Sequence, residues 1–249
     1  MMAQKSIDMP HIIKKSDIAN LVKIFSSFLY GNYKICVIKS NVCGYYPPDI
    51  EILHAILREI FPKCNMIFIG DTSSTIYNAD KRLIELGLKR LADSFGEKVK
   101  AVDFSKISET IKVQVPKPHA LKNYPIPKIV YDTDLLVNIG KIGIHSTTTI
   151  TVACKNLFGL VSSKMKYFKY HPLGMDRVIA DLVQIIKPDV NIFEASNYIV
   201  IGKDVLSVDI AASLLIGINP VNVKHLRLIS SDRNLNLADI VNLLKESIE

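Results

Sequence analysis

Residues 34–71 read KICVIKSNVCGYYPPDIEILHAILREIFPKCNMIFIGD, and they indicate the fold class of the whole chain. At the two ends lie Lys34–Lys39 and Asn65–Gly70, short apolar runs rich in β-branched residues, which is typical of strands buried on both faces. Between them, prolines and Asp49 open a segment with apolar residues at helical spacing: Ile52, Leu53, Ile56, Leu57 and Ile60. The stretch therefore predicts a strand, a helix and a second strand.

The same alternation continues along the chain in both directions from this unit. Further strands are expected at Val99–Phe104, Asp134–Ile139, Val190–Phe193 and Tyr198–Ile201, and helices over residues 77–95, 149–158, 174–186, 205–216 and 237–248 and after Asn219-Pro220. Four prolines make residues 115–127 an extended connection rather than a helix. Buried strands alternating with helices predict an α/β fold with a largely parallel central sheet and helices on both faces, as one domain over residues 1–249.

Composition narrows the class of protein. Hydrophobic residues make up 49% and charged residues 22% of the 249, the balance of a globular chain. The sequence has no apolar run near the roughly 20 residues of a membrane-spanning helix, and residues 1–15 lack a secretory signal. The four cysteines show no paired spacing, so we expect reduced thiols and a cytoplasmic protein with no membrane partner. Scarce Gln beside abundant Lys favours a thermophilic or archaeal source.

The net charge of +7 is spread along the chain rather than collected in one tail. The exception is residues 164–171, KMKYFKYH, where basic and aromatic residues alternate in a way that could hold a nucleic-acid backbone and stack bases. We favour a solvated loop with its aromatic rings turned inward. A nucleic-acid-binding protein is therefore the alternative function, and a homo-oligomer is compatible with the sequence.

Polar and charged residues follow the predicted strands, where parallel sheets place their ligand crevice. Lys39 and Asn41 follow the first strand, Asp71 the second, and Lys141 and His145 the strand near residue 134. Next come Thr147 and Thr148, which would begin a helix that carries Lys155 and Asn156. The N-terminus of such a helix favours an anion, although the hydroxyls could equally serve as caps.

These residues resemble the domain of unknown function 362 family, whose members are often fused to iron–sulfur ferredoxin modules. The resemblance extends over nearly the whole chain and is carried by short motifs in the family's order: Ile38–Asn41, Ile69–Asp71, Asn138–His145 (NIGKIGIH), Cys154–Gly159 (CKNLFG), His171 and Ser207–Asp209. It implies an α/β fold with a pocket lined by these motifs, but no settled reaction.

The chain departs from the family pattern in three places. Gly143 and Ile144 stand where the family usually has a lysine and a threonine, and the Gly-Pro-rich loop expected after Glu194 is missing. Cys-x-x-Cys is absent from the sequence, so we expect no iron–sulfur cluster on this chain. A redox accessory protein that acts with a separate iron–sulfur partner remains a further alternative.

The residues allow several chemistries without selecting one, so whether the protein is an enzyme stays open. His145 is the acid–base candidate because an unperturbed imidazole titrates near neutrality. Asp209 is either a second catalytic carboxylate or a polar residue in the first turns of a helix. A metal could bind His145 and His171 with Asp71 or Asp209, but the spacing matches no known ligand motif, so the metal is left unknown.

Nucleotide-binding and serine-hydrolase motifs are absent from the sequence, and a fold-level analogy to metal-cofactor hydroxyacid racemases leaves isomerisation open. We expect a protein that binds a small carboxylate or phosphate. The ligand-binding residues expected for it are Lys39, Asn41, Asp71, Lys141, Thr147, Thr148, Lys155, Asn156 and His171.

Overall fold

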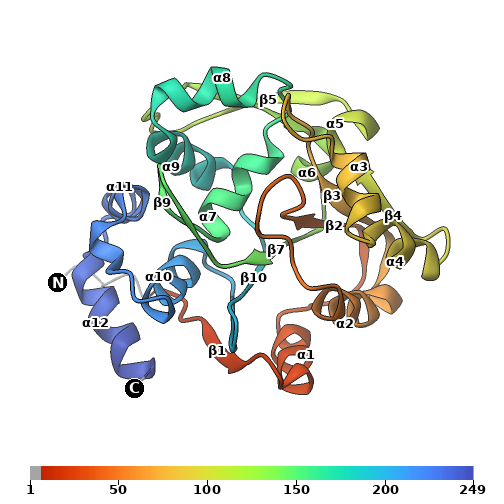
Figure 1. Cartoon of the computed structure of the whole chain (residues 1–249), viewed down its shortest axis with the longest axis horizontal. Coiled ribbons are helices and arrows are strands. Elements are labelled where there is room, and N and C mark those ends of the chain that lie inside the picture. Colours follow the sequence, from red (N-terminus) through yellow and green to blue (C-terminus); the bar gives the residue numbers. More distant parts are fainter. Residues whose placement is uncertain (1–6, 249) are drawn as a thin grey trace.

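A computed structural model describes residues 7–248 and contains a seven-stranded sheet at its centre (Figure 1). The strand order is β1-β11-β10-β7-β2-β3-β4. The bounds are β1 His11–Lys14, β2 Tyr33–Ser40, β3 Cys64–Asp71, β4 Val99–Asp103, β7 Leu135–Lys141, β10 Val190–Glu194 and β11 Tyr198–Gly202. Two small hairpins lie outside it, β5 (Thr110–Gln114) with β6 (Asn123–Pro127) and β8 (Gly143–His145) with β9 (Thr149–Thr151).

The five strands from β10 to β4 run parallel, which confirms the predicted fold class. β11 runs antiparallel to β10, and β1 is antiparallel to β11. The chain goes from β2 to β3 and β4 on one side and later returns to β7 on the other side of β2. The boundary between β2 and β7 is therefore the switch point at which doubly wound sheets place their ligand crevice.

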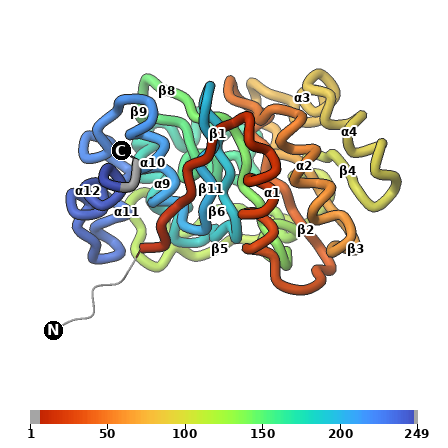
Figure 2. Tube along the Cα trace, turned by 90° about the horizontal axis from the view of Figure 1, so that it is seen from below, coloured from red at the N-terminus to blue at the C-terminus, as the bar shows by residue number. Residues whose placement is uncertain are grey.

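Helices cover both faces of the sheet because alternate residues of each strand point to opposite sides. Val37 packs into one apolar cluster with α7, α9 and α10, whereas Cys36 and Ile38 pack into the other with α1, α2 and α4. Figure 2 shows α9–α12 gathered on one side and α1–α4 on the other. The bounds of these helices are α1 Ile18–Ser27, α2 Ile50–Ile60, α3 Ala79–Glu85, α4 Leu88–Ser94, α7 Ala153–Asn156, α9 Met175–Ile185, α10 Val205–Leu215, α11 Lys224–Asp232 and α12 Leu237–Ile248.

Three predicted segments differ in the structure. The helix expected over residues 77–95 is split into α3 and α4 by Gly87, whose φ of +76° ends the first of them. The helix expected over residues 149–158 begins instead as strand β9, and α7 is only four residues long. Residues 164–171 form the short helix α8 (Lys166–Tyr170) rather than a loop. The other short helices are α5 (Phe104–Ile107) and α6 (Lys128–Tyr131).

The cysteine prediction was wrong for two of the four residues. Cys36 of β2 and Cys64 of β3 form a disulfide, with their Cα atoms 6.3 Å apart, while Cys43 and Cys154 are free. The two residues lie on neighbouring strands, although 28 positions separate them in the sequence. The argument from reduced thiols to a reducing compartment therefore does not hold. None of the helices within residues 7–248 combines the length and apolarity needed to cross a membrane.

Candidate functional site

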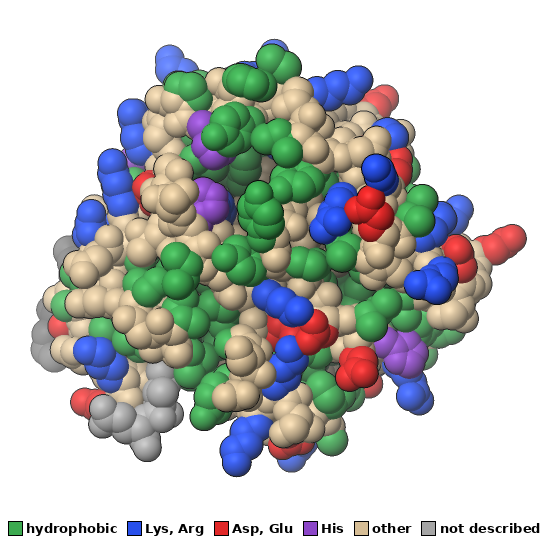
Figure 3. All heavy atoms as spheres, viewed as in Figure 1, with side chains coloured by type: hydrophobic (Ala, Val, Ile, Leu, Met, Phe, Trp, Pro, Cys, Tyr) green, Lys and Arg blue, Asp and Glu red, His purple; other side chains and the backbone are tan. Residues whose placement is uncertain are grey.

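A pocket of about 420 Å³ opens at the carboxyl ends of β2 and β3, beside the switch point. Figure 3 shows this face of the molecule, where hydrophobic side chains and histidines border a hollow. The lining comes from the loops after β2 and β3, from the β8–β9 hairpin and from the segment that contains α7 and α8. It includes Lys39, Asn41, Cys43, Tyr45, Tyr46, Asp71, Tyr77, His145, Thr151, Lys155, Asn156, Phe158, Gly159, Lys166, Tyr167 and His171.

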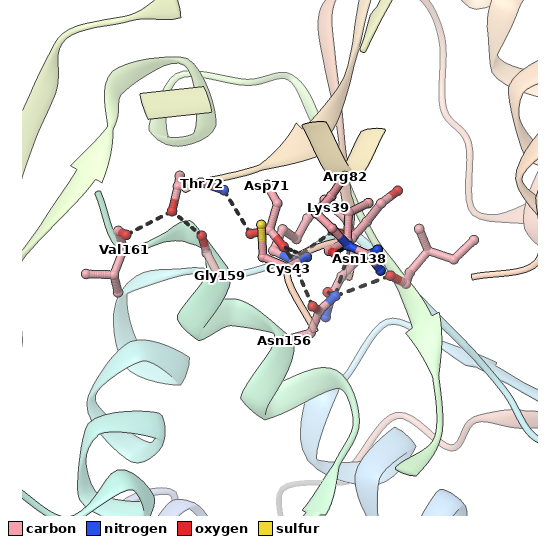
Figure 4. A network of polar contacts seen from close by, with 12 residues as sticks. Lys39, Cys43, Asp71, Thr72, Arg82, Asn138, Asn156, Gly159 and Val161 are labelled. Carbon is pink, nitrogen blue, oxygen red and sulfur yellow. Dashed lines mark hydrogen bonds and ion pairs between the residues drawn. The ribbon is translucent and has the colours of Figure 1, made fainter. Parts of the chain in front are cut away.

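Lys39 lies at the bottom of the pocket and is fully buried. Its ammonium group donates to Asn156 Oδ1 at 2.8 Å and to the Ser40 carbonyl at 3.1 Å, and Asp71 Oδ2 is 3.2 Å away (Figure 4). The three acceptors match the three N–H donors of the ammonium group. Lys39 is thus a cation held firmly in place by the protein.

A row of asparagines supports this lysine from beneath. Lys39, Asn138 and Asn191 occupy matching positions on the adjacent strands β2, β7 and β10. Asn138 donates to Asn191 Oδ1 at 2.8 Å and accepts from Asn156 Nδ2 at 2.7 Å. Because buried amides are costly unless they are paired, this connected network fixes the orientation of Asn156 and so of the Lys39 ammonium group.

Lys166 of α8 is a second buried cation in the pocket. Its ammonium group donates to the carbonyls of Thr72 at 3.0 Å and Gly159 at 3.1 Å and also contacts Thr72 Oγ1. Burial lowers its pKa to about 8, an effect that Asp71 partly opposes. Only Lys164 and Lys169 of the basic run remain exposed, so the run presents fewer charges to a nucleic acid than its sequence suggests.

Lys155 differs from the other two pocket lysines. Thr151 Oγ1, at 3.2 Å, is its hydrogen-bond partner, and within the described part of the chain no carboxylate lies within ion-pair distance of its ammonium group. Burial lowers the pKa of Lys155 to about 7, with Asp176 acting in the opposite direction. The pocket therefore contains an amine that the protein itself leaves largely unsatisfied.

The two pocket histidines are neutral near pH 7. Burial, with repulsion from Lys155 and His171, lowers the pKa of His145 to about 4, so the expected titration near neutrality is not what the structure shows. Its Nδ1 accepts from the backbone N–H groups of Thr147 at 3.2 Å and Thr148 at 3.4 Å, which leaves the ring proton on Nε2. Burial and Lys155 also lower the pKa of His171.

The structure brings together seven of the predicted site residues and separates four others. Lys39, Asn41, Asp71, His145, Lys155, Asn156 and His171 all line the pocket. Lys141 does not, because it pairs with Asp49, which also binds Lys15. Thr147 is exposed, and the buried Thr148 donates to the Ile150 carbonyl. The anion site expected at a helix start here is wrong, since this segment is the β8–β9 hairpin.

Asp209 also lies outside the pocket. Its buried carboxylate accepts from the backbone N–H of Cys154 at 3.2 and 3.3 Å, and its Oδ2 is 3.8 Å from Nε2 of the buried His225. It therefore binds the N-terminal turn of α7 from the neighbouring helix α10. In residues 7–248, His, Cys, Asp and Glu side chains form no group of three or more that could hold a metal ion.

Lys166 and the aromatic residues that line the pocket were not predicted as site residues from the sequence. Tyr45, Tyr77, Phe158 and Tyr167 line the pocket, and the Tyr167 ring lies 4.1 Å from that of His171, centroid to centroid. The signal for Lys166 was its place at the start of a five-residue run, KYFKY, in which residues four apart are buried. The prediction of a loop with its aromatic rings turned inward was wrong for Tyr167 and Phe168, which are exposed, whereas Lys166 is buried.

Comparisons with known proteins identify the family of the chain. The family called Domain of unknown function (DUF362) matches residues 36–214, a range that contains every pocket residue named above. Among curated proteins, the Thylakoid-associated protein sll1697 of Synechocystis sp. is 31% identical over 74 residues, which is 28% of this chain and 23% of that protein. The match thus spans less than a quarter of that relative.

Two solved structures are similar in fold. The lactate racemase apoprotein from Thermoanaerobacterium thermosaccharolyticum has a TM-score of 0.46 and 16% identity, covering 84% of this chain and 57% of that one. A protein from Thermotoga maritima has a TM-score of 0.46 and 12% identity, covering 81% and 58%. At these identities, neither neighbour says anything about the reaction of this chain.

Proposed function

The chain belongs to the DUF362 family, whose description assigns no activity, and from that starting point we propose that it binds a small anionic metabolite, a carboxylate or phosphate, in the pocket at the carboxyl ends of β2 and β3. The observation that carries the proposal is Lys155, an amine inside the pocket whose partner among the described residues is a single hydroxyl. A bound anion would supply the missing acceptors and countercharge.

The balance of charge in the pocket supports the same conclusion. The lining includes three lysines, Lys39, Lys155 and Lys166, against one carboxylate, Asp71. With both histidines neutral, the charged lysines outnumber the carboxylate, and an electrostatic potential of this sign in a recessed site attracts anions. The volume of about 420 Å³ is within the usual range for small-molecule sites.

Thermal unfolding with added anions tests the proposal. Phosphate, sulfate and acetate are compared with chloride at constant ionic strength and pH 6.5, where Lys155 is mostly charged. At tenfold excess over its dissociation constant, a ligand of the native state stabilises it by about 1.4 kcal/mol, so we expect Tm to rise by roughly 3–5 °C.

Two variants locate the response. Lys155→Gln should remove most of the shift in Tm, because its side chain provides the free donor. Lys141→Gln is the matched control, since Lys141 pairs with Asp49 outside the pocket, and it should keep the shift. A wild type that responds to these anions no more than to chloride, or an equal loss in both variants, would refute the proposed site.

A further inference from the structure

We propose that Lys155 is a nucleophilic amine that forms an imine with the carbonyl carbon of a small 2-oxo acid bound in this pocket. The inference rests on the anion site proposed above and adds to it a reactive group and a class of substrate. It concerns bond formation with the ligand rather than binding alone.

The different surroundings of the three pocket lysines single out Lys155. Lys39 has three acceptors, one each from Ser40, Asn156 and Asp71. Lys166 also has three, which are the carbonyl and the hydroxyl of Thr72 and the carbonyl of Gly159. An ammonium group has three donors, so these two lysines are fully engaged as fixed cations. Among residues 7–248, the Thr151 hydroxyl at 3.2 Å is the one partner of Lys155, and its nitrogen is free to turn toward a ligand.

The protonation state of Lys155 suits this chemistry. Only an unprotonated amine attacks a carbonyl, and desolvated lysines are the ones used for Schiff bases in proteins. With a pKa of about 7, about half of the Lys155 side chains carry the free base at neutral pH, whereas an ordinary lysine with a value of 10.5 is almost wholly protonated.

The other groups in the pocket can assist the proton transfers of the reaction. The lone pair of Lys155 Nζ attacks the carbonyl carbon, the C=O π bond opens, and a proton moves from nitrogen to oxygen to give the carbinolamine. Its C–O bond then breaks, oxygen leaves as water with a second proton, and the C=N bond forms. The second proton of the water comes from the Lys155 nitrogen, and His145, a pocket residue with its proton on Nε2, is suited to donate a hydrogen bond to the departing oxygen.

The rest of the lining defines the substrate class. The positive charge of Lys39 and Lys166 exceeds the negative charge of Asp71 and attracts the carboxylate of a 2-oxo acid without a direct hydrogen bond, while Phe158 and Tyr167 offer aromatic surface to an apolar side chain. Water is the sole product besides the imine, so no oxidant or reductant is required. A 2-oxo acid with an apolar or aromatic side chain therefore matches the pocket in three respects: its carbonyl reacts with Lys155, its carboxylate is attracted by the positive charge, and its side chain packs on the aromatic rings.

Reductive trapping provides the test. The wild-type protein is incubated at pH 7 with phenylpyruvate and sodium cyanoborohydride, which reduces imines to stable amines, and the adducts are assigned by peptide mapping. We expect Lys155 to be modified at least tenfold faster than the exposed Lys89, which serves as reference within the same sample. Phenyllactate, which has a hydroxyl in place of the carbonyl, should slow the modification without forming an adduct.

The outcomes separate this inference from the proposed anion site. If Lys155 is modified no faster than Lys89 while anions still raise Tm, the imine is refuted and the anion site stands. If Lys155 is not trapped and anions do not raise Tm, both the imine and the anion site are refuted. If Lys155 is trapped but anions do not raise Tm, the assignment to a 2-oxo acid is overturned. Lys155→Arg, which keeps the charge but cannot form the imine, should lose the adduct; the comparison with Lys89 decides the matter even if that variant does not fold.

Discussion

Lys155 carries an ammonium group into a pocket where one hydroxyl is its hydrogen-bond partner, and this arrangement has a cost for the folded protein. Burial disfavours the charged form, which is why the pKa of Lys155 falls to about 7 from an ordinary value of 10.5. Groups that weaken a fold in this way are common at functional sites, where stability and function conflict. The cost can be measured through its pH dependence.

Lys155→Met should therefore stabilise the protein at low pH. Between pH 7 and 10.5 the unfolded chain binds more protons at Lys155 than the folded chain does, so the free energy of unfolding of the wild type rises with pH in that window. Below pH 7 the wild type bears the full penalty, on the order of a few kcal/mol. We expect the variant to have a higher Tm at pH 6 and its advantage to disappear near pH 10.

The measurement is a series of thermal melts across this range, with Lys89→Met as the exposed control. The control should show the same small difference from the wild type at every pH. An advantage of Lys155→Met that did not change with pH would mean that better packing, rather than the removed charge, is the cause.

Position at strand ends was enough to predict Lys39, Asn41, Asp71 and His145 as pocket residues, because parallel strands place their carboxyl ends at one edge. It failed for Lys141, whose partner Asp49 lies at the start of α2. For Asp209 the sequence left a catalytic and a helix-stabilising role open, and its partner is the backbone of α7. In both cases tertiary packing determines which partner the charged side chain has.

At the scale of elements, the segment from α7 to Gly159 closes the pocket against the buried ion pair. A Cβ atom at Gly159 would lie 2.7 Å from Lys39 Nζ and would overlap Lys39 Cε and Asp71 Oδ1. Neither side chain has space to withdraw, since Lys39 is fully buried and Asp71 is 1% exposed. The absence of a side chain at Gly159 is thus what allows the chain to pass over Lys39.

Gly159→Ala should destabilise the protein by about 1–3 kcal/mol, the usual cost of overpacking. It should also abolish the rise in Tm with phosphate, because the Lys39–Asp71 pair must move. Chemical denaturation measures the loss of stability, and thermal melts with and without phosphate measure the rise in Tm.

A suitable comparison is Gly96→Ala, where the backbone φ of +77° makes alanine strained but no atom lies within 4 Å of the added Cβ. It should lower stability and keep the phosphate response. If Gly159→Ala kept that response too, the ion pair would not be part of the binding site.

Most of the longer helices were predicted from the sequence, but the ten-residue α1 was not, and the short β8–β9 hairpin was missed. Periodicity identified α2, α9 and α12 because each has two or more turns with one apolar side. α10, in which Val205–Ser213 are all buried, was identified by the cap Asp204 before an apolar run. The β8–β9 hairpin and α7 have three or four residues each, too few for a period, and Thr149 has an unfavourable φ of +65° that packing must sustain. A helix start was therefore predicted at Thr147 where the structure has the β8–β9 hairpin.

At the scale of the whole molecule, the Cys36–Cys64 disulfide links the neighbouring strands β2 and β3. Closing a loop over a separation of 28 residues restricts the unfolded chain and is worth about 3–4 kcal/mol in the chain-entropy account. We expect reduction to lower the Tm, and we expect one cooperative transition with or without the disulfide, because both apolar clusters pack on the same sheet.

Thiol titration and calorimetry test this prediction together. The unfolded protein should present two thiols, those of Cys43 and Cys154, before reduction and four afterwards. Four thiols at the outset would show that the bridge does not form, and two separate transitions would show that the chain contains two folding units.

The outer edge of the sheet also bears on the synthesis of the chain. Among the described strands, β1, at residues 11–14, pairs with β11 alone, at residues 198–202, so β1 leaves the ribosome well before its partner. At about 5–20 residues per second, translation keeps β1 without its neighbour for roughly 10–40 s. The strands and helices that build the pocket are complete earlier, so the ligand site can assemble on the ribosome while the edge that closes the sheet is still unpaired.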